Sequence, residues 1–154
     1  MKATFDKSFS LFFDLLLTDE YLRLATRPSL FREEVQSRSA NITHIVVDEI
    51  QRIPFLLNEI HHIMENQDTP FFALSGSSAR KLKKDHADLL AGRAWNLNLY
   101  PLTHIEAGSQ FSLQRALNMG TLPSVYLSEK ESARKTLKAY IETYLKEEIQ
   151  AEAV

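Results

Sequence analysis

The stretch that most constrains the fold is Ile42–Glu49, which reads Ile-Thr-His-Ile-Val-Val-Asp-Glu. Consecutive β-branched residues suit a strand that is buried on both faces, as strands are in a parallel sheet covered by helices. The two carboxylates then stand at the carboxyl end of the strand, the edge where open α/β sheets bind their ligands. A plainer interpretation stays open, in which Asp48 and Glu49 are two solvated acids that follow a buried strand.

Asp48 and Glu49 have the chemistry of a nucleotide-hydrolysing site. One carboxylate can hold a magnesium ion that itself carries nucleotide phosphates. A second carboxylate beside it can orient or deprotonate the attacking water. The pattern predicts the Walker B arrangement of a P-loop ATPase, with Asp48 as the metal-binding residue and Glu49 as the catalytic residue.

The phosphate-binding loop of such an ATPase, called Walker A, is absent from the sequence. That loop follows the pattern Gly-x-x-x-x-Gly-Lys-Ser/Thr. The four glycines of the chain are Gly76, Gly92, Gly108 and Gly120, and no two of them have this spacing. The main source of phosphate binding in a P-loop enzyme is therefore missing.

The composition narrows the class of protein. A chain of 154 residues is long enough for one domain with a full core, and 44% hydrophobic with 25% charged residues is typical of globular proteins. A net charge of −2 gives no electrostatic reason to expect nucleic acid or an anionic membrane. The lack of cysteine excludes disulfides and thiolate sites, and no apolar run is long enough to span a membrane. We expect a cytoplasmic protein.

The order of the expected elements indicates an α/β fold, in which strands of a parallel sheet alternate with flanking helices and the last third is all helical. The expected strands are Ser8–Asp14, Ile42–Glu49, Pro70–Ser75 and the alternating segment Ala94–Tyr100. The expected helices are one capped by Thr18, then Ser29–Ser37, Pro54–Asn66, one capped by Ser77 or Ser78, Phe111–Asn118 and Glu129–Gln150. Thr103–Glu106 and Ser128–Glu131 match the capping box at the start of a helix.

Several motifs in this order span nearly the whole chain. They are Phe13-Asp14-Leu15-Leu16, Val46-Val47-Asp48-Glu49-Ile50-Gln51, Leu74-Ser75-Gly76-Ser77-Ser78-Ala79-Arg80-Lys81-Leu82, Leu89-Leu90-Ala91-Gly92-Arg93, Tyr100-Pro101-Leu102-Thr103, Gly120-Thr121-Leu122-Pro123 and Tyr140–Ile149. In succession they resemble the prokaryotic AAA-superfamily ATPases that carry a carboxyl-terminal domain of unknown function and are related to archaeal-type ATPases. No single one of these motifs would be enough to indicate the family.

The resemblance implies roles for further residues. It implies that Asp48 supports magnesium, that Glu49 polarises the hydrolytic water, and that Ser75 or Ser77 reads the γ-phosphate of ATP. Arg93 would stabilise charge in the transition state, with Arg80 as the second candidate. For Arg93 the alternative is a structural arginine at a helix terminus.

The resemblance also implies the domain organisation and the limits of activity. Residues 1–102 would be a partial ATPase core and residues 103–154 the start of a lid or winged-helix-like region. The chain would be an internal fragment of an ATP-hydrolysing enzyme that uses ATP and Mg²⁺, itself inactive because the phosphate loop is missing. The alternative is a non-catalytic remnant that binds a protein or associates with itself; nucleic-acid binding through Arg80–Lys84 is less favoured.

The missing strand has a consequence for the sheet. In the family, the Walker A strand lies between the strands that correspond to Pro70–Ser75 and Ala94–Tyr100. Strands must lie about 4.8 Å apart to pair, so its removal leaves a gap. We therefore expect Ala94–Tyr100 either to close up against Pro70–Ser75 or to detach, and the exposed edge to favour instability or self-association.

Overall fold

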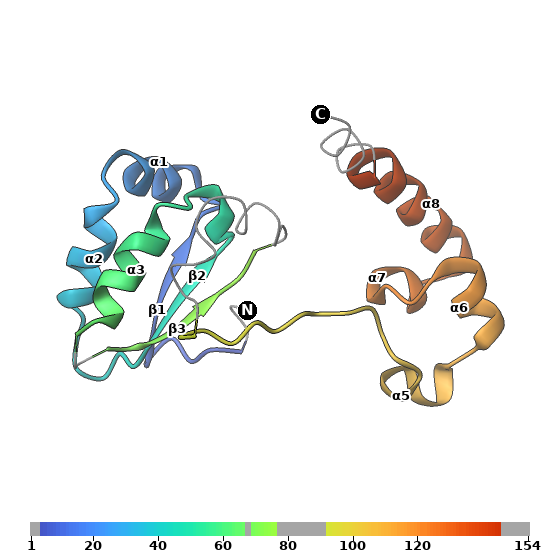
Figure 1. Ribbon diagram of the computed structural model, residues 1–154. Helices are drawn as coiled ribbons and strands as arrows, with labels where there is room; N and C mark the ends of the chain where they lie inside the picture. The colour runs from blue at the N-terminus through green and yellow to red at the C-terminus, as the bar shows by residue number, and fades with distance from the viewer. Residues whose placement is uncertain (1–3, 67–68, 77–91, 146–154) are drawn as a thin grey trace. The chain divides into compact units, whose positions relative to one another are not determined.

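The computed structural model describes residues 4–66, 69–76 and 92–145 (Figure 1). The chain forms two compact units, Met1–Trp95 and Asn96–Val154. The described residues of the first unit contain a β-sheet with helices, and those of the second contain helices alone. The α/β fold with a helical carboxyl-terminal part that the sequence predicts is confirmed.

The sheet is parallel and has the strand order β1-β2-β3 within the described residues. Its strands are β1 (Ser10–Asp14), β2 (His44–Asp48) and β3 (Phe71–Leu74). The central strand β2 pairs with both neighbours, and Val47 is opposite Phe13 on one side and Leu74 on the other. The first strand of the chain thus lies beside the strand that ends in Asp48.

Three helices cover one face of the sheet (Figure 1): α1 (Thr18–Thr26), α2 (Ser29–Gln36) and α3 (Leu56–Met64). Their apolar residues recur at helical spacing and meet alternate residues of the strands. The core cluster is Phe13, Leu15, Leu24, Phe31, Val35, Ile45, Val47, Ile50, Ile53, Leu56, Leu57, Ile60 and Ile63. Because alternate strand residues point to opposite faces, Val46, Asp14 and Asp48 lie on the face of the sheet opposite the three helices, which we call the second face.

Ion pairs tie the three helices together at their polar surfaces. The Arg23 guanidinium of α1 donates to Glu34 of α2 and, at 2.8 Å, to Glu20. The hydrogen bond to Glu34 is the main reason that the pKa of Arg23 is raised. Arg32 of α2 lies 3.2 Å from Glu59 of α3.

The start of α1 differs from the sequence prediction. Thr18 is the first helical residue, and the preceding Leu17 has no side-chain cap. Asp14 holds the turn instead, since its Oδ1 accepts a hydrogen bond of 3.0 Å from the Leu16 amide and its carbonyl accepts one of 3.1 Å from the Leu17 amide. The Asp14 carboxylate thus stabilises the turn before α1, and the predicted cap at Thr18 is wrong because Thr18 is already helical.

The predicted strand Ala94–Tyr100 is wrong. These residues form no strand, and the side chains of Trp95, Leu97 and Leu99 are 94%, 87% and 101% exposed. The segment crosses the boundary between the two compact units, so the expectation that it closes up against Pro70–Ser75 or detaches stays a prediction. The alternation of apolar and polar residues suits a half-buried strand, but a strand forms only where a neighbouring backbone pairs with it.

The helical unit consists of short elements. They are α5 (His104–Ala107), the 3-10 turn η3 (Gly108–Gln110), α6 (Leu113–Met119), α7 (Pro123–Tyr126), α8 (Lys130–Tyr140) and the π-helical segment η4 (Ile141–Leu145). The expected α-helix Glu129–Gln150 is thus shorter, because its hydrogen-bonding pattern changes after Tyr140; residues 146–150 lie outside the described part. In the described residues no helix is long and apolar enough to cross a membrane.

The two predicted capping boxes have different outcomes. At Thr103 the box is confirmed: the hydroxyl of Thr103 accepts from the Glu106 amide at 3.3 Å, and the Glu106 carboxylate accepts from the Thr103 amide at 2.8 Å. At Ser128 the box is wrong, because the Ser128 hydroxyl donates to the carbonyls of Ser124 and Val125 at 2.9 and 3.1 Å. Ser128 therefore serves the end of α7 rather than the start of α8.

Candidate functional site

Asp48 and Ser75 meet at the carboxyl ends of two neighbouring parallel strands. Asp48 is the last residue of β2, and Ser75 directly follows β3. The Ser75 hydroxyl donates a hydrogen bond to Asp48 Oδ1. The backbone fixes this meeting, since the Ser75 amide donates to the Val47 carbonyl at 2.9 Å and the Ser75 carbonyl accepts from the Ile50 amide at 2.9 Å. The two residues therefore lie together at one edge of the sheet.

Glu49 lies directly after β2 in a left-handed backbone conformation, with φ 60° and ψ 44°. It is the only residue other than glycine with positive φ in the part of the chain that the structure describes. This conformation turns the chain out of the strand into the 3-10 turn η1 (Ile50–Arg52), where the Arg52 amide donates to the Glu49 carbonyl at 2.9 Å. Gln51 Nε2 donates to Glu49 Oε2, so a neighbouring amide side chain holds the carboxylate.

Asp14 belongs to the same edge, although the sequence analysis gave it no site role. It pairs in register with Asp48, and parallel strands place such partners on the same face of the sheet. The Leu15 amide donates to the Asp48 carbonyl at 3.2 Å, which continues the pairing past the end of β1. Its position as the last residue of the first strand, equivalent to that of Asp48, was the signal that could have found it.

Arg52 is a second residue that the sequence analysis missed. Its Nη1 donates to the Leu15 carbonyl at 2.5 Å, and its guanidinium carbon lies 4.6 Å from the centre of the Tyr21 ring. A guanidinium over an aromatic face gains from the negative face of the ring. Arg52 thereby joins the turn that follows Glu49 to the loop that follows Asp14.

The remaining predicted site residues are not brought to Asp48 by any described contact. Arg93 Nη1 lies 3.1 Å from His61 Nε2 on α3. Because guanidinium has only donors, His61 Nε2 is the acceptor, which leaves the ring proton on Nδ1, 4.0 Å from Glu65. Ser77 and Arg80, and the predicted cap at Ser78, lie outside the described residues. The role of Arg93 stays a prediction.

The donor set at the edge suits a magnesium ion. The Asp48 carboxylate, the Ser75 hydroxyl and the Glu49 carboxylate all present oxygen, the ligand atom that Mg²⁺ prefers. Among the described residues there is no group of three or more histidine or acidic side chains close enough to hold a metal without other ligands. Mg²⁺ commonly binds through one or two carboxylates and keeps water and phosphate as its other ligands.

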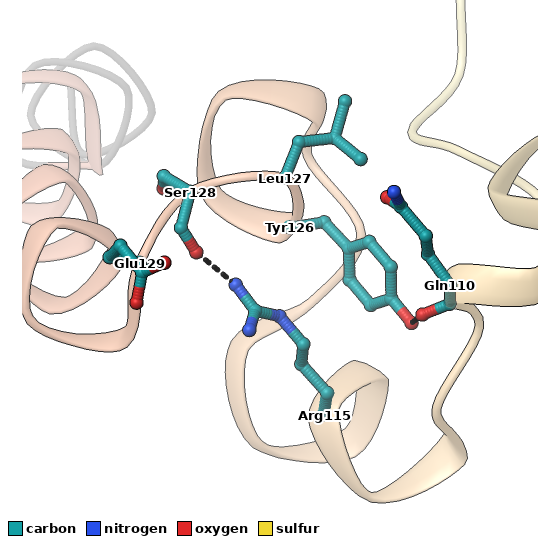
Figure 2. Close-up of a pocket in the computed structure, with 6 residues that line it drawn as sticks. All are labelled: Gln110, Arg115, Tyr126, Leu127, Ser128 and Glu129. Atoms are coloured by element: carbon teal, nitrogen blue, oxygen red, sulfur yellow. Dashed lines mark hydrogen bonds between the residues drawn. The ribbon is translucent and has the colours of Figure 1, made fainter.

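A separate polar pocket of about 250 Å³ lies in the helical unit (Figure 2). Its lining residues are Gln110, Arg115, Tyr126, Leu127, Ser128 and Glu129. The Arg115 guanidinium donates to the Ser128 carbonyl and lies 5.5 Å from the Tyr126 ring, so it holds α6 against the turn between α7 and α8. Because Glu129 also lines the pocket, it offsets the positive charge there, and we assign Arg115 a structural role.

Comparison with protein families gives a match to the AAA domain over residues 1–107. The chain belongs to the AAA domain family. No curated protein and no solved structure matches it significantly. The match covers β1, β2 and β3, and with them Asp14, Asp48 and Ser75. Proteins with an AAA domain generally use ATP and Mg²⁺, and the carboxyl edge of the sheet in this AAA domain is where its acidic and hydroxyl side chains meet.

Proposed function

We propose that this AAA domain carries the metal-binding half of an ATPase site. In the proposal Asp48 supports Mg²⁺, Glu49 orients the attacking water, and Ser75 positions Asp48 and reads the γ-phosphate of ATP. The observation that carries the proposal is the hydrogen bond from Ser75 to Asp48 at the ends of two neighbouring parallel strands. Ligands of open α/β sheets bind at this edge.

Each residue has a distinct part in this proposal. A bound Mg²⁺ would supply positive charge that neutralises phosphate oxygens. Ser75 fixes one oxygen of Asp48 and leaves the second carboxylate oxygen for a metal ligand or its water shell. Gln51 fixes Oε2 of Glu49, and the left-handed backbone at Glu49 orients that carboxylate relative to the strand. Arg93 remains a candidate for stabilising charge, and Ser77 and Arg80 remain candidates for nucleotide contacts.

We further propose that the 154 residues do not hydrolyse ATP at a measurable rate by themselves. The backbone amides and lysine of a phosphate loop supply most of the phosphate binding in a P-loop enzyme. The pattern Gly-x-x-x-x-Gly-Lys-Ser/Thr does not occur in this sequence. Even with a metal ion at Asp48 and a water molecule at Glu49, this sequence therefore has no phosphate loop to hold the γ-phosphate of ATP in place.

Phosphate release tests the second proposal. The wild-type chain and Glu49→Gln are incubated with millimolar ATP and Mg²⁺, and inorganic phosphate is followed over hours. We expect equal rates from the two proteins. Faster release by the wild type than by Glu49→Gln would show that this chain is a working ATPase without the loop.

Metal binding tests the first proposal independently of hydrolysis. Mn²⁺ replaces Mg²⁺ as a paramagnetic probe, and backbone amide signals are recorded by NMR as Mn²⁺ is added. We expect the signals of Asp48, Glu49 and Ser75 to broaden first, and Asp48→Asn to remove this broadening. Asp19→Asn is the matched control, since Asp19 is an exposed acid in the first turn of α1. Equal broadening in wild type and Asp48→Asn would contradict a metal site at Asp48.

A further inference from the structure

Asp14 and Asp48 are in-register partners at the ends of two neighbouring strands. Asp14 is the last residue of β1, and Asp48 is the last residue of β2. Neighbouring strands lie about 4.8 Å apart, and in-register residues of parallel strands point to the same face of the sheet. Ser75, which follows β3 and donates to the Asp48 carboxylate, continues the row on the other side of Asp48. We call these three residues the edge row.

Local hydrogen bonds hold the Asp14 carboxylate at this edge. Asp14 Oδ1 accepts a hydrogen bond of 3.0 Å from the Leu16 amide, and the Asp14 carbonyl accepts one of 3.1 Å from the Leu17 amide. The Leu15 amide donates to the Asp48 carbonyl at 3.2 Å, so the two backbones stay paired just past Asp14. A carboxylate offers about four lone-pair sites, and the bond from Leu16 uses one of them. The turn therefore fixes Asp14 without using its full acceptor capacity.

The spacing of the edge row suits a hydrated magnesium ion. Mg²⁺ binds oxygen atoms at about 2.0–2.1 Å and keeps several of its waters. A hydroxyl that donates to a carboxylate lies about 2.5–2.7 Å from the accepting oxygen. A carboxylate oxygen that is roughly 4–5 Å from the ion therefore still interacts with it through one bound water. This distance is close to the spacing of about 4.8 Å between paired strands.

We propose that Asp14 is the second carboxylate of the metal site and binds the Mg²⁺ at Asp48 through a metal-bound water. This inference rests on the proposed function, because it requires the ion at Asp48. The alternative is that Asp14 only closes the turn after β1. The two roles make different demands on the side chain: the turn needs an acceptor oxygen, which asparagine also has, whereas attraction of a doubly charged ion depends on the negative charge.

The first test is a Mn²⁺ titration of the full chain, followed by the broadening of the amide signals of the edge row. Asp14→Asn should weaken Mn²⁺ binding about 10–100-fold, as is typical when a partner in the outer shell of a metal is lost. Asp6→Asn is the matched control and should bind like the wild type. Asp6 Oδ1 accepts from the Ser8 amide at 2.8 Å in the same kind of turn, but Asp6 precedes β1 and so belongs to the opposite end of that strand.

The Asp48→Asn variant separates this inference from the proposed function. If Asp48→Asn removes Mn²⁺ binding and Asp14→Asn binds like the wild type, the role of Asp14 is overturned and the metal site at Asp48 stands. If Asp48→Asn also binds like the wild type, both proposals fail. Weakening by Asp14→Asn together with loss in Asp48→Asn supports both.

The second test separates a lost metal contact from a damaged fold. A ligand that binds only the folded chain raises its stability by an amount that depends on the dissociation constant. Mg²⁺ should therefore raise the urea midpoint of the wild type and of Asp6→Asn more than that of Asp14→Asn. Each protein is compared with itself without Mg²⁺, so a change in its own stability cancels. Asp14→Ser, which also provides a turn acceptor without a charge, should behave like Asp14→Asn. Equal Mg²⁺-induced shifts in the wild type and in both neutral variants would overturn the proposal.

Discussion

Replacement of Glu49 by glycine and by alanine separates its backbone conformation from its chemistry. Both substitutions remove the carboxylate and its hydrogen bond to Gln51. They differ in the backbone, since glycine adopts φ 60° without strain and alanine does not. The difference in unfolding free energy between Glu49→Gly and Glu49→Ala therefore reports the backbone at position 49 rather than the carboxylate.

The magnitude follows from two opposing terms. A left-handed residue with a Cβ atom costs about 1–2 kcal/mol. Glycine loses more conformational freedom on folding than alanine, which costs roughly 0.5–1 kcal/mol. We expect Glu49→Gly to be more stable than Glu49→Ala by about 0.5–1 kcal/mol. If the slope of a urea titration is about 1.5 kcal/mol/M, this is a midpoint difference of roughly 0.3–0.7 M.

Urea titrations followed by far-UV circular dichroism measure this difference. Asn58 provides the matched pair, because it is an exposed residue of α3 with helical φ and ψ. There alanine should be the more stable substitution by about 1 kcal/mol. The sign of the Gly–Ala difference should thus reverse between positions 49 and 58. If alanine were equal or better at position 49 as well, Glu49 would not be left-handed in solution, and the argument that its backbone orients the carboxylate would fail.

Three further predictions concern the core and the helix caps. Ile60→Ala should destabilise the chain by about 2–5 kcal/mol, because the side chain is fully buried, whereas Leu99→Ala should change stability by less than about 0.5 kcal/mol; urea titrations compare the two. The hydrogen bonds from Thr103 lower the pKa of Glu106, and the bond from the backbone amide has a larger effect than the bond from the hydroxyl. The stability that these bonds contribute is therefore fully present above the ordinary glutamate pKa and is lost as the pH falls through the lowered pKa. Thr103→Ala should raise the pKa of Glu106, followed by NMR titration, only part of the way to the ordinary glutamate value, because the bond from the backbone amide remains. Ser128→Ala should leave the start of α8 unchanged.

The sequence by itself determined the strand–helix order and the chemistry at the end of β2. Ile45, Val46 and Val47 are buried on a central parallel strand because β-branched residues without charge suit such a position. The meeting of Asp48 with Ser75 also followed from the sequence, since both stand at the carboxyl ends of strands and parallel strands end at one edge. The capping box at Thr103 was predictable because its hydrogen bonds are local.

Only the tertiary structure decided which local patterns found a partner. Ala94–Tyr100 has a strand pattern, but strand pairing requires a second backbone, and the sequence pattern does not contain that information. Ser128 matches the first position of a capping box, yet its hydroxyl donates to the carbonyls of Ser124 and Val125 in α7. Asp14 and Arg52 joined the edge through register and loop contacts between residues far apart in the chain. Local hydrogen bonds and periodicity can be read along a sequence, whereas competition among distant partners is settled only when the chain has folded.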